Sequence, residues 1–143
     1  DPTHWIPTMN YEYWEPGIHE ILVEYDRQFP DMPLVVTESG IATENGVRRA
    51  EHIVRTLEQI WLAVEAGVDV RGYYHWSLID NFEWAEGYAK RFGLIHVNYA
   101  TQRRTPKDSA AWYKGIIATN GENLRRGSAR RSGRQAGRPH PAS

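Results

Sequence analysis

The sequence predicts an α/β fold that is part of a larger structure. Amphipathic helical patterns alternate with short apolar, β-branched runs in the order helix, strand, helix, strand, helix. Strands separated by a crossover helix pair in parallel, and a parallel sheet needs helices on both faces or around a closed barrel. Because two strands cannot complete such a sheet, we expect residues 1–121 to form the end of a larger α/β structure.

The first part of the chain predicts a loop, a helix and a buried strand. Residues 1–15 are irregular and rich in aromatic side chains, which indicates a loop packed against other parts of the protein. Across residues 16–29 apolar positions recur at helical spacing, and Pro30 ends this pattern. Residues 34–37 form a continuous run of apolar and β-branched residues, typical of a buried strand, which is followed by Glu38.

The middle of the chain predicts a long helix and a second strand. Apolar residues recur every three or four positions over residues 47–66, and Gly67 stands where a left-handed C-cap is expected. Residues 68–78 are rich in β-branched and aromatic side chains and predict a second buried strand. Residues 79–93 form a long loop, and loops of this length are more often functional than idle.

The last part predicts an exposed strand and a final helix. Residues 94–99 alternate between apolar and polar side chains, as an exposed strand does. Thr105 is the expected N-cap of the final helix and Pro106 its first residue. We expect this helix to run to about Ala118 and to end at Asn120 and Gly121.

Composition excludes several classes of site. The 143 residues contain no cysteine, so the chain has no disulfide framework, thiolate metal site or cysteine nucleophile. No apolar run approaches the ~20 residues of a membrane span, and we favour a cytoplasmic location. Residues 122–143 hold six arginines against one acid and carry a charge of +5, whereas the preceding residues carry −6. We expect this Arg-rich tail to be disordered, with contact to nucleic acid as the alternative.

Glu38 is the first candidate for a catalytic residue. In a parallel α/β barrel the residues at the carboxyl ends of the strands face the active site, and Glu38 stands at such an end. A surface glutamate between a strand and a loop is the alternative that this stretch alone leaves open. Glu44 occupies a similar local sequence but has no strand before it, so Glu38 is preferred.

Three motifs follow one another along the chain. They are VTESGIA at residues 36–42, GYYHWSLIDNFEW at residues 72–84, and the pair GY and RFG within residues 87–93. Together they resemble the C-terminal part of family-one glycoside hydrolases, the β-glucosidase and β-galactosidase group, over about residues 7–121. The resemblance implies the C-terminal portion of a (β/α)8 TIM barrel, about strands seven and eight with their flanking helices.

The resemblance also implies roles for individual residues. It makes Glu38 the nucleophile of a retaining mechanism, which proceeds through a covalent glycosyl-enzyme. It assigns hydrogen bonds with sugar hydroxyls to Glu83 and Trp84, a stacking wall to Trp76, and a place in the same pocket to Phe92. Because the Glu83 carboxylate repels a phosphate, the expected substrates are β-linked sugars without phosphate groups.

The second carboxyl group of the reaction is not found in the sequence. Retaining hydrolysis takes two carboxyl groups about 5–5.5 Å apart, of which one protonates the leaving oxygen. The family's asparagine-glutamate-proline motif has no counterpart, because Trp14 precedes Glu15 and Pro16 where that motif has asparagine, and we interpret these residues as a helix start. We therefore expect hydrolysis to need an N-terminal segment of the same barrel, from a separate or cleaved chain, and this chain alone to be inactive.

Two other functions remain open at this level. One is a non-catalytic carbohydrate-binding remnant that keeps Trp76, Glu83 and Trp84. The other is a nucleic-acid binder that acts through the Arg-rich tail and uses the rest as a scaffold. The six histidines show no metal-ligand spacing and no glycine-rich phosphate cradle is present, so we expect neither a metal nor a cofactor. The sequence does not separate glucose from galactose or fucose as the preferred sugar.

Overall fold

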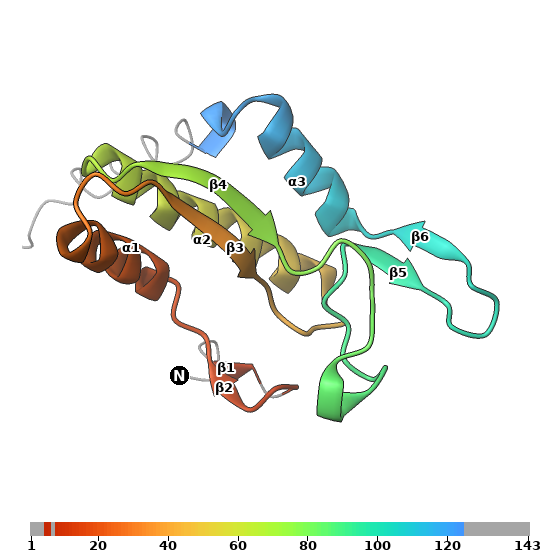
Figure 1. The fold of residues 1–143 in the computed structure, drawn as a ribbon. Coiled ribbons are helices and arrows are strands. Elements are labelled where there is room, and N and C mark those ends of the chain that lie inside the picture. Colours follow the sequence, from red (N-terminus) through yellow and green to blue (C-terminus); the bar gives the residue numbers. More distant parts are fainter. Residues whose placement is uncertain (1–4, 7, 125–143) are drawn as a thin grey trace, which may run out of the picture.

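A computed structural model describes residues 5–6 and 8–124 of the chain (Figure 1). The predicted order of helix, strand, helix, strand and helix is present. The structure adds an N-terminal strand pair, a partner strand for the predicted strand at residues 94–99, and a short 3-10 helix. The elements in chain order are β1 (Trp5–Ile6), β2 (Tyr11–Glu12), α1 (Pro16–Gln28), β3 (Leu34–Ser39), α2 (Gly46–Glu65), β4 (Val70–His75), η2 (Trp84–Glu86), β5 (Ile95–Val97), β6 (Arg104–Pro106) and α3 (Asp108–Ala118).

The centre of the fold is a parallel pair of strands, β3 and β4, with helices behind it (Figure 1). One apolar cluster joins α1 and α2 to the strands, and Val36 is buried in it. Its buried members are Leu22, Val36, Ile60, Ala63 and Val68. A second cluster of Ile53, Leu94 and Ile116 joins α2 to α3. The core therefore lies on the side of the sheet that the helices cover.

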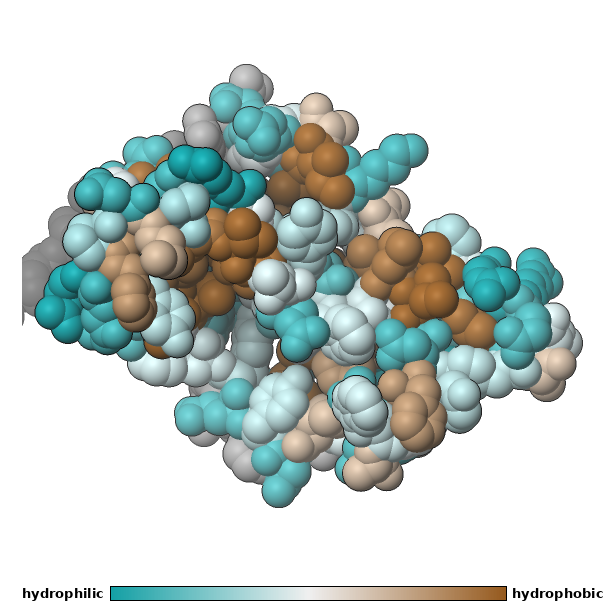
Figure 2. Space-filling view, viewed as in Figure 1, coloured by the Kyte–Doolittle hydropathy of each residue, from teal (hydrophilic) through white to brown (hydrophobic). Residues whose placement is uncertain are grey.

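The opposite side of the sheet carries exposed apolar side chains. Val35 and Tyr74 are 48% and 64% exposed, and Leu78 beyond the end of β4 is 66% exposed. Figure 2 shows hydrophobic side chains gathered over β3 and β4 on this side of the molecule. We call this side the open face of the sheet. Burial of such groups is the main driving force of folding, so an uncovered apolar face marks an interaction surface.

Several predicted elements differ from those in the structure. Residues 1–15 were expected to form a loop, but Trp5–Ile6 and Tyr11–Glu12 pair as an antiparallel hairpin. Thr105 was expected to be an N-cap, and this prediction is wrong because Thr105 pairs with His96 in the β5–β6 ladder. Its extended backbone delays the helix, so that Lys107 is the N-cap residue and makes no side-chain capping bond.

The observed ends of two other strands differ from the predicted ends. The predicted strand 68–78 is shorter and covers Val70–His75, and the predicted strand 94–99 covers Ile95–Val97. Gly67 has the positive φ of 102° that its C-cap position requires. Most of the Arg-rich tail, residues 125–143, lies outside the described residues. Leu124 was assigned to that tail, but it packs against the cluster of α2 and α3.

None of the helices in the described ranges combines the length and the apolar character that crossing a membrane requires.

Candidate active site

The register of β3 and β4 shifts by one residue between Val36 and Ser39, the stretch that contains Glu38. Val36 pairs with Tyr73. The next pair is Ser39 with His75, so three steps along β3 match two steps along β4. Such a bulge leaves one residue unpaired and exchanges the faces on which the following side chains lie. Val36 packs toward the helices, and regular alternation would send Glu38 the same way. The bulge instead leaves Glu38 exposed and brings Ser39 to the helix side.

Glu38 lies at the edge of a cavity of about 470 Å³ at the carboxyl ends of the two strands. Three of its predicted partners, Trp76, Glu83 and Trp84, line the same cavity. The complete lining is Glu38, Ser39, Gly40, Trp76, Glu83 and Trp84. Segments separated by more than thirty residues in the sequence thus converge where parallel strands end, as expected for a ligand site in an α/β fold.

Gly40 allows the two strand ends to approach closely. A β-carbon at this position would stand 1.8 Å from the Trp76 carbonyl oxygen, a steric clash that excludes every residue other than glycine. The Trp76 amide in turn donates to the Ser39 carbonyl at 2.9 Å. The glycine that breaks the strand motif is therefore required by the contact that places Trp76 beside Glu38.

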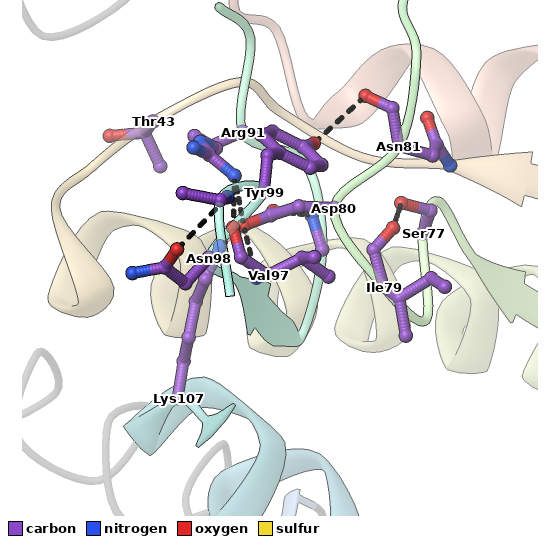
Figure 3. Close-up of polar contacts among 12 residues, drawn as sticks. Thr43, Ser77, Ile79, Asp80, Asn81, Arg91, Val97, Asn98, Tyr99 and Lys107 are labelled. Carbon is purple, nitrogen blue, oxygen red and sulfur yellow. Dashed lines mark hydrogen bonds and ion pairs between the residues drawn. The ribbon is translucent and has the colours of Figure 1, made fainter. Parts of the chain in front are cut away.

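Asp80 fixes the start of the loop that carries Glu83 (Figure 3). Its side chain is fully buried and accepts hydrogen bonds from the Gly93 amide at 2.9 Å and from Lys107 Nζ at 2.9 Å. Arg91 Nη1 and the Val97 amide approach its other oxygen at 3.2 and 3.3 Å. Burial opposes ionisation, but the hydrogen bond and charge of Lys107 and the two amides hold the pKa of Asp80 below its usual value.

The contacts of Asp80 join four parts of the chain. In Figure 3 Lys107 reaches up to Asp80 from the start of α3, while Arg91 lies on the other side of Asp80. Gly93 is needed here because a β-carbon would stand 2.2 Å from the Asp80 amide nitrogen. A buried carboxylate that is paired and hydrogen-bonded in this way keeps one position. The loop between Asp80 and Gly93 therefore starts and ends at fixed points.

Glu83 and Trp84 stand at the tip of that loop. The Glu83 amide donates to the Gly87 carbonyl at 2.7 Å, which closes the turn around η2. Glu83 Oε2 is buried and has no hydrogen-bond partner among the described residues. Trp84 is 82% exposed. An unpaired carboxylate oxygen beside an exposed indole is suited to a polar ligand with an apolar face, such as a sugar.

Tyr11 joins the site and was not predicted from the sequence. Its hydroxyl donates to the Gly40 carbonyl at 3.5 Å, and burial together with the charge of Glu83 raises the pKa of Tyr11. It belongs to β2, at a distance in the sequence from both motifs that form the cavity. Only the aromatic character of residues 1–15 indicated that this segment packs against other parts of the protein.

Phe92 is not brought into the cavity with the other candidates. It is 7% exposed and does not line the cavity. Its carbonyl accepts a hydrogen bond from the Ser77 amide at 3.4 Å, so it lies behind Trp76 in the core. Contact between Phe92 and a ligand remains a prediction.

Glu44 and Glu15, the two other glutamates in similar local sequences, lie away from the cavity. Glu44 is exposed in the loop before α2, next to the N-cap Asn45, and does not line the cavity. Glu15 is the N-cap residue of α1, as expected for a helix start, and pairs with Arg55. Neither carboxylate stands at a strand end.

A layer of polar and aromatic side chains lies behind the strand ends, toward α2. His52 Nε2 is 3.3 Å from Ser39 Oγ, and its ring centroid is 6.2 Å from that of His75. Burial, together with the neighbouring His75, lowers the pKa of His52 to about 4. Burial also lowers the pKa of His75 to about 4. Both rings are therefore neutral at pH 7, and no group of three or more metal-ligating side chains occurs within the part of the chain that the structure describes.

The chain matches a known protein family over most of its length. The family model described as "Glycosyl hydrolase family 1" matches residues 2–122. A bifunctional β-D-glucosidase/β-D-fucosidase of Bifidobacterium breve is 43% identical over 133 residues, which cover 80% of this chain and 29% of that protein. Beta-glucosidase A of Thermotoga maritima is 38% identical and is covered over 27% of its length.

Solved structures agree with these matches. The family 1 β-glucosidase from Thermotoga maritima superposes with a TM-score of 0.77 at 38% identity, over 79% of this chain and 28% of that one. A β-glycosidase from Pyrococcus horikoshii gives a TM-score of 0.73 at 42% identity, over 76% of this chain and 25% of that one. The chain thus spans between a quarter and three tenths of the length of these relatives.

Proposed function

The chain belongs to glycosyl hydrolase family 1 and forms part of a (β/α)8 barrel, and from this premise we propose that it carries the nucleophile of a retaining β-glycosidase. The nucleophile is Glu38, and β3 and β4 are the seventh and eighth strands of the barrel. The observation that carries the proposal is the convergence of Glu38, Trp76, Glu83 and Trp84 on one cavity at the carboxyl ends of parallel strands.

The proposed reaction has two steps. A carboxylate oxygen of Glu38 attacks the anomeric carbon while an acid group protonates the leaving oxygen, so that one ester bond forms and the glycosidic bond breaks. In the second step the group that acted as the acid now acts as a base and takes a proton from water. The water oxygen then displaces Glu38 from the anomeric carbon and releases the sugar. The exposed position of Glu38 at the cavity edge leaves its oxygens accessible for this attack.

The remaining cavity residues recognise the sugar. Glu83 Oε2, which has no partner among the described residues, accepts a hydrogen bond from a sugar hydroxyl. The indole N–H of Trp84 donates another, and Trp76 presents a face to the C–H surface of the ring. The negative charge of Glu83 opposes a phosphate at this place, so the substrates are terminal β-linked sugars without phosphate.

The acid/base group comes from a segment outside this chain. Among the described residues, Glu38 is the candidate at a strand end, and Glu83 is assigned to sugar hydroxyls. The open face of the sheet leaves Val35 and Tyr74 without cover, as expected where other strands of the barrel belong. We propose that an N-terminal barrel segment covers this face and supplies the second carboxyl group.

The test is hydrolysis of an aryl β-glucoside. The chain alone is expected to give no turnover above the buffer rate, and its mixture with an N-terminal barrel segment of a family 1 β-glucosidase is expected to release the aryl alcohol. Turnover by the chain alone would overturn the requirement for the second segment. Sugar binding by the mixture without turnover or covalent labelling would instead favour a carbohydrate-binding role.

A further inference from the structure

The side of β3 behind Glu38 holds a hydrogen bond that the proposed reaction does not use. We infer that Ser39 and His52 are positioning residues, which hold the bulge of β3 and so keep the Glu38 carboxylate in the cavity. The inference rests on the proposed function, because it concerns how the nucleophile is presented. Its structural part, the fixing of the strand end, can be measured without any catalysis.

The bulge needs support that the strand ladder does not give. One residue between Val36 and Ser39 has no partner on β4, so regular pairing does not fix the backbone between these two residues, where Glu38 lies. Pairing resumes at Ser39, whose carbonyl accepts from the Trp76 amide at 2.9 Å. A contact that fixes Ser39 therefore fixes the backbone on the C-terminal side of Glu38.

His52 is suited to fix Ser39 because it cannot readily move. It lies in the first half of α2 and is 7% exposed. Its ring is tilted against Tyr13 at 5.6 Å and against His75 at 6.2 Å between centroids. The packed helix holds the ring in place, and Nε2 meets Ser39 Oγ at 3.3 Å.

The contact with Ser39 is the hydrogen bond on which the His52 ring depends. His52 Nδ1 has no hydrogen-bond partner among the described residues, so Ser39 Oγ is the contact that satisfies the ring. Removing that hydroxyl leaves a buried polar nitrogen unpaired, which proteins avoid. Side chains that keep a hydrogen-bonding group at either position preserve the contact. This gives the inference a chemical signature beyond mere packing.

The first experiment measures amide hydrogen exchange in the 143-residue chain. Ser39→Ala and His52→Met are expected to speed exchange about tenfold at residues 37–40 and to leave α1 unchanged. Ser39→Thr and His52→Gln are expected to restore the original rates. Ser109→Ala, at a buried serine of α3, is the matched control and is expected to leave residues 37–40 unchanged.

Two outcomes would overturn the inference. One is unchanged exchange at residues 37–40 in Ser39→Ala. The other is an equal rise over all elements, which indicates a loss of global stability rather than of local order. If His52→Met does not fold, Ser39→Ala decides the matter alone, because it removes a single oxygen atom.

The second experiment measures turnover after mixing with the N-terminal segment. A displaced nucleophile lowers kcat by between about tenfold and 10²-fold, since small misplacements cost this much, while KM stays within about twofold. Restored kcat in Ser39→Thr supports the inference, and an unchanged kcat in Ser39→Ala overturns it. If the mixture of the unaltered chain and the N-terminal segment gives no turnover, the proposed function fails, and the exchange rates still decide whether Ser39 and His52 fix the strand end.

Discussion

The two faces of the β3–β4 sheet differ in how far this chain completes them. Behind the sheet, Val36 is 8% exposed and packs with α1 and α2. On the open face, Val35 and Tyr74 are about half and two thirds exposed. Glu38 lies on the open face although its place in the alternation would put it with Val36. The stabilising core and the candidate chemistry therefore occupy opposite faces of the sheet, and the bulge in β3 places Glu38 on the open face.

The largest expected effect is on the open face. Glu38→Gln keeps the shape of the side chain and removes the proposed nucleophile, so turnover with the N-terminal segment is expected to fall on the order of 10³-fold or more. Unfolding by urea is expected to be unchanged, because Glu38 is exposed. Steady-state hydrolysis of an aryl β-glucoside measures the first effect.

Glu44→Gln is the control for that variant. Glu44 is exposed in a loop and does not line the cavity, so its loss is expected to leave turnover unchanged. A larger loss of turnover in Glu44→Gln than in Glu38→Gln would show that the nucleophile is not at the strand end.

The next effect concerns the loop that borders the open face. Asp80→Asn removes a fully buried charge and leaves Lys107 without its partner, which is expected to cost about 3 kcal/mol of unfolding free energy. Because Asp80 starts the loop, exchange around Glu83 is expected to increase as well. Urea denaturation followed by tryptophan fluorescence measures the loss, and an unchanged midpoint would show that the contacts of Asp80 do not hold this loop.

A smaller effect tests the helix-covered face through pH. The pKa of His52 is about 4 in the folded chain and ~6.5 when unfolded. The unfolded chain therefore takes up the proton first as pH falls, so stability is complete above pH ~6.5 and decreases toward pH 4, by about 2 kcal/mol between pH 6.5 and 4.5. In His52→Gln this slope is expected to be smaller, and an identical slope in both chains would contradict the burial of His52.

The smallest effect is expected at an exposed ion pair. Asp69 pairs with Arg71 at 2.7 Å, but both side chains are more than half exposed. Water and salt screen such pairs, so Asp69→Asn is expected to leave the urea midpoint unchanged within error. A shift of the urea midpoint as large as that of Asp80→Asn would show that burial of the carboxylate does not decide its contribution to stability.

Much of the fold followed from local patterns. The helices and the two parallel strands have apolar periodicities that their own residues determine, and Glu38, Trp76, Glu83 and Trp84 come together in one cavity. The errors occurred where partners distant in the sequence decide the conformation. Thr105 carries a local capping signal, but its pairing with His96 places it in a strand. Pairing across a hairpin likewise orders Tyr11, which a local pattern does not show.

Two features of the site could not be predicted in this way. The bulge depends on the register between β3 and β4, which is a property of the pair and not of either strand. The exclusion of Phe92 from the cavity depends on packing behind Trp76, because an aromatic residue in a loop motif fits a pocket wall and a core equally well. In both cases the residue types were compatible with either outcome.

Covalent trapping identifies the residue that attacks the sugar. The chain, mixed with the N-terminal segment, is treated with a 2-deoxy-2-fluoro-β-glucoside that carries a good leaving group, and the digested protein is mapped by mass spectrometry. We expect one glycosyl group, attached to Glu38 on the open face and absent in Glu38→Gln. A glycosyl group attached to Glu44 or to Glu83, with Glu38 unmodified, would contradict it.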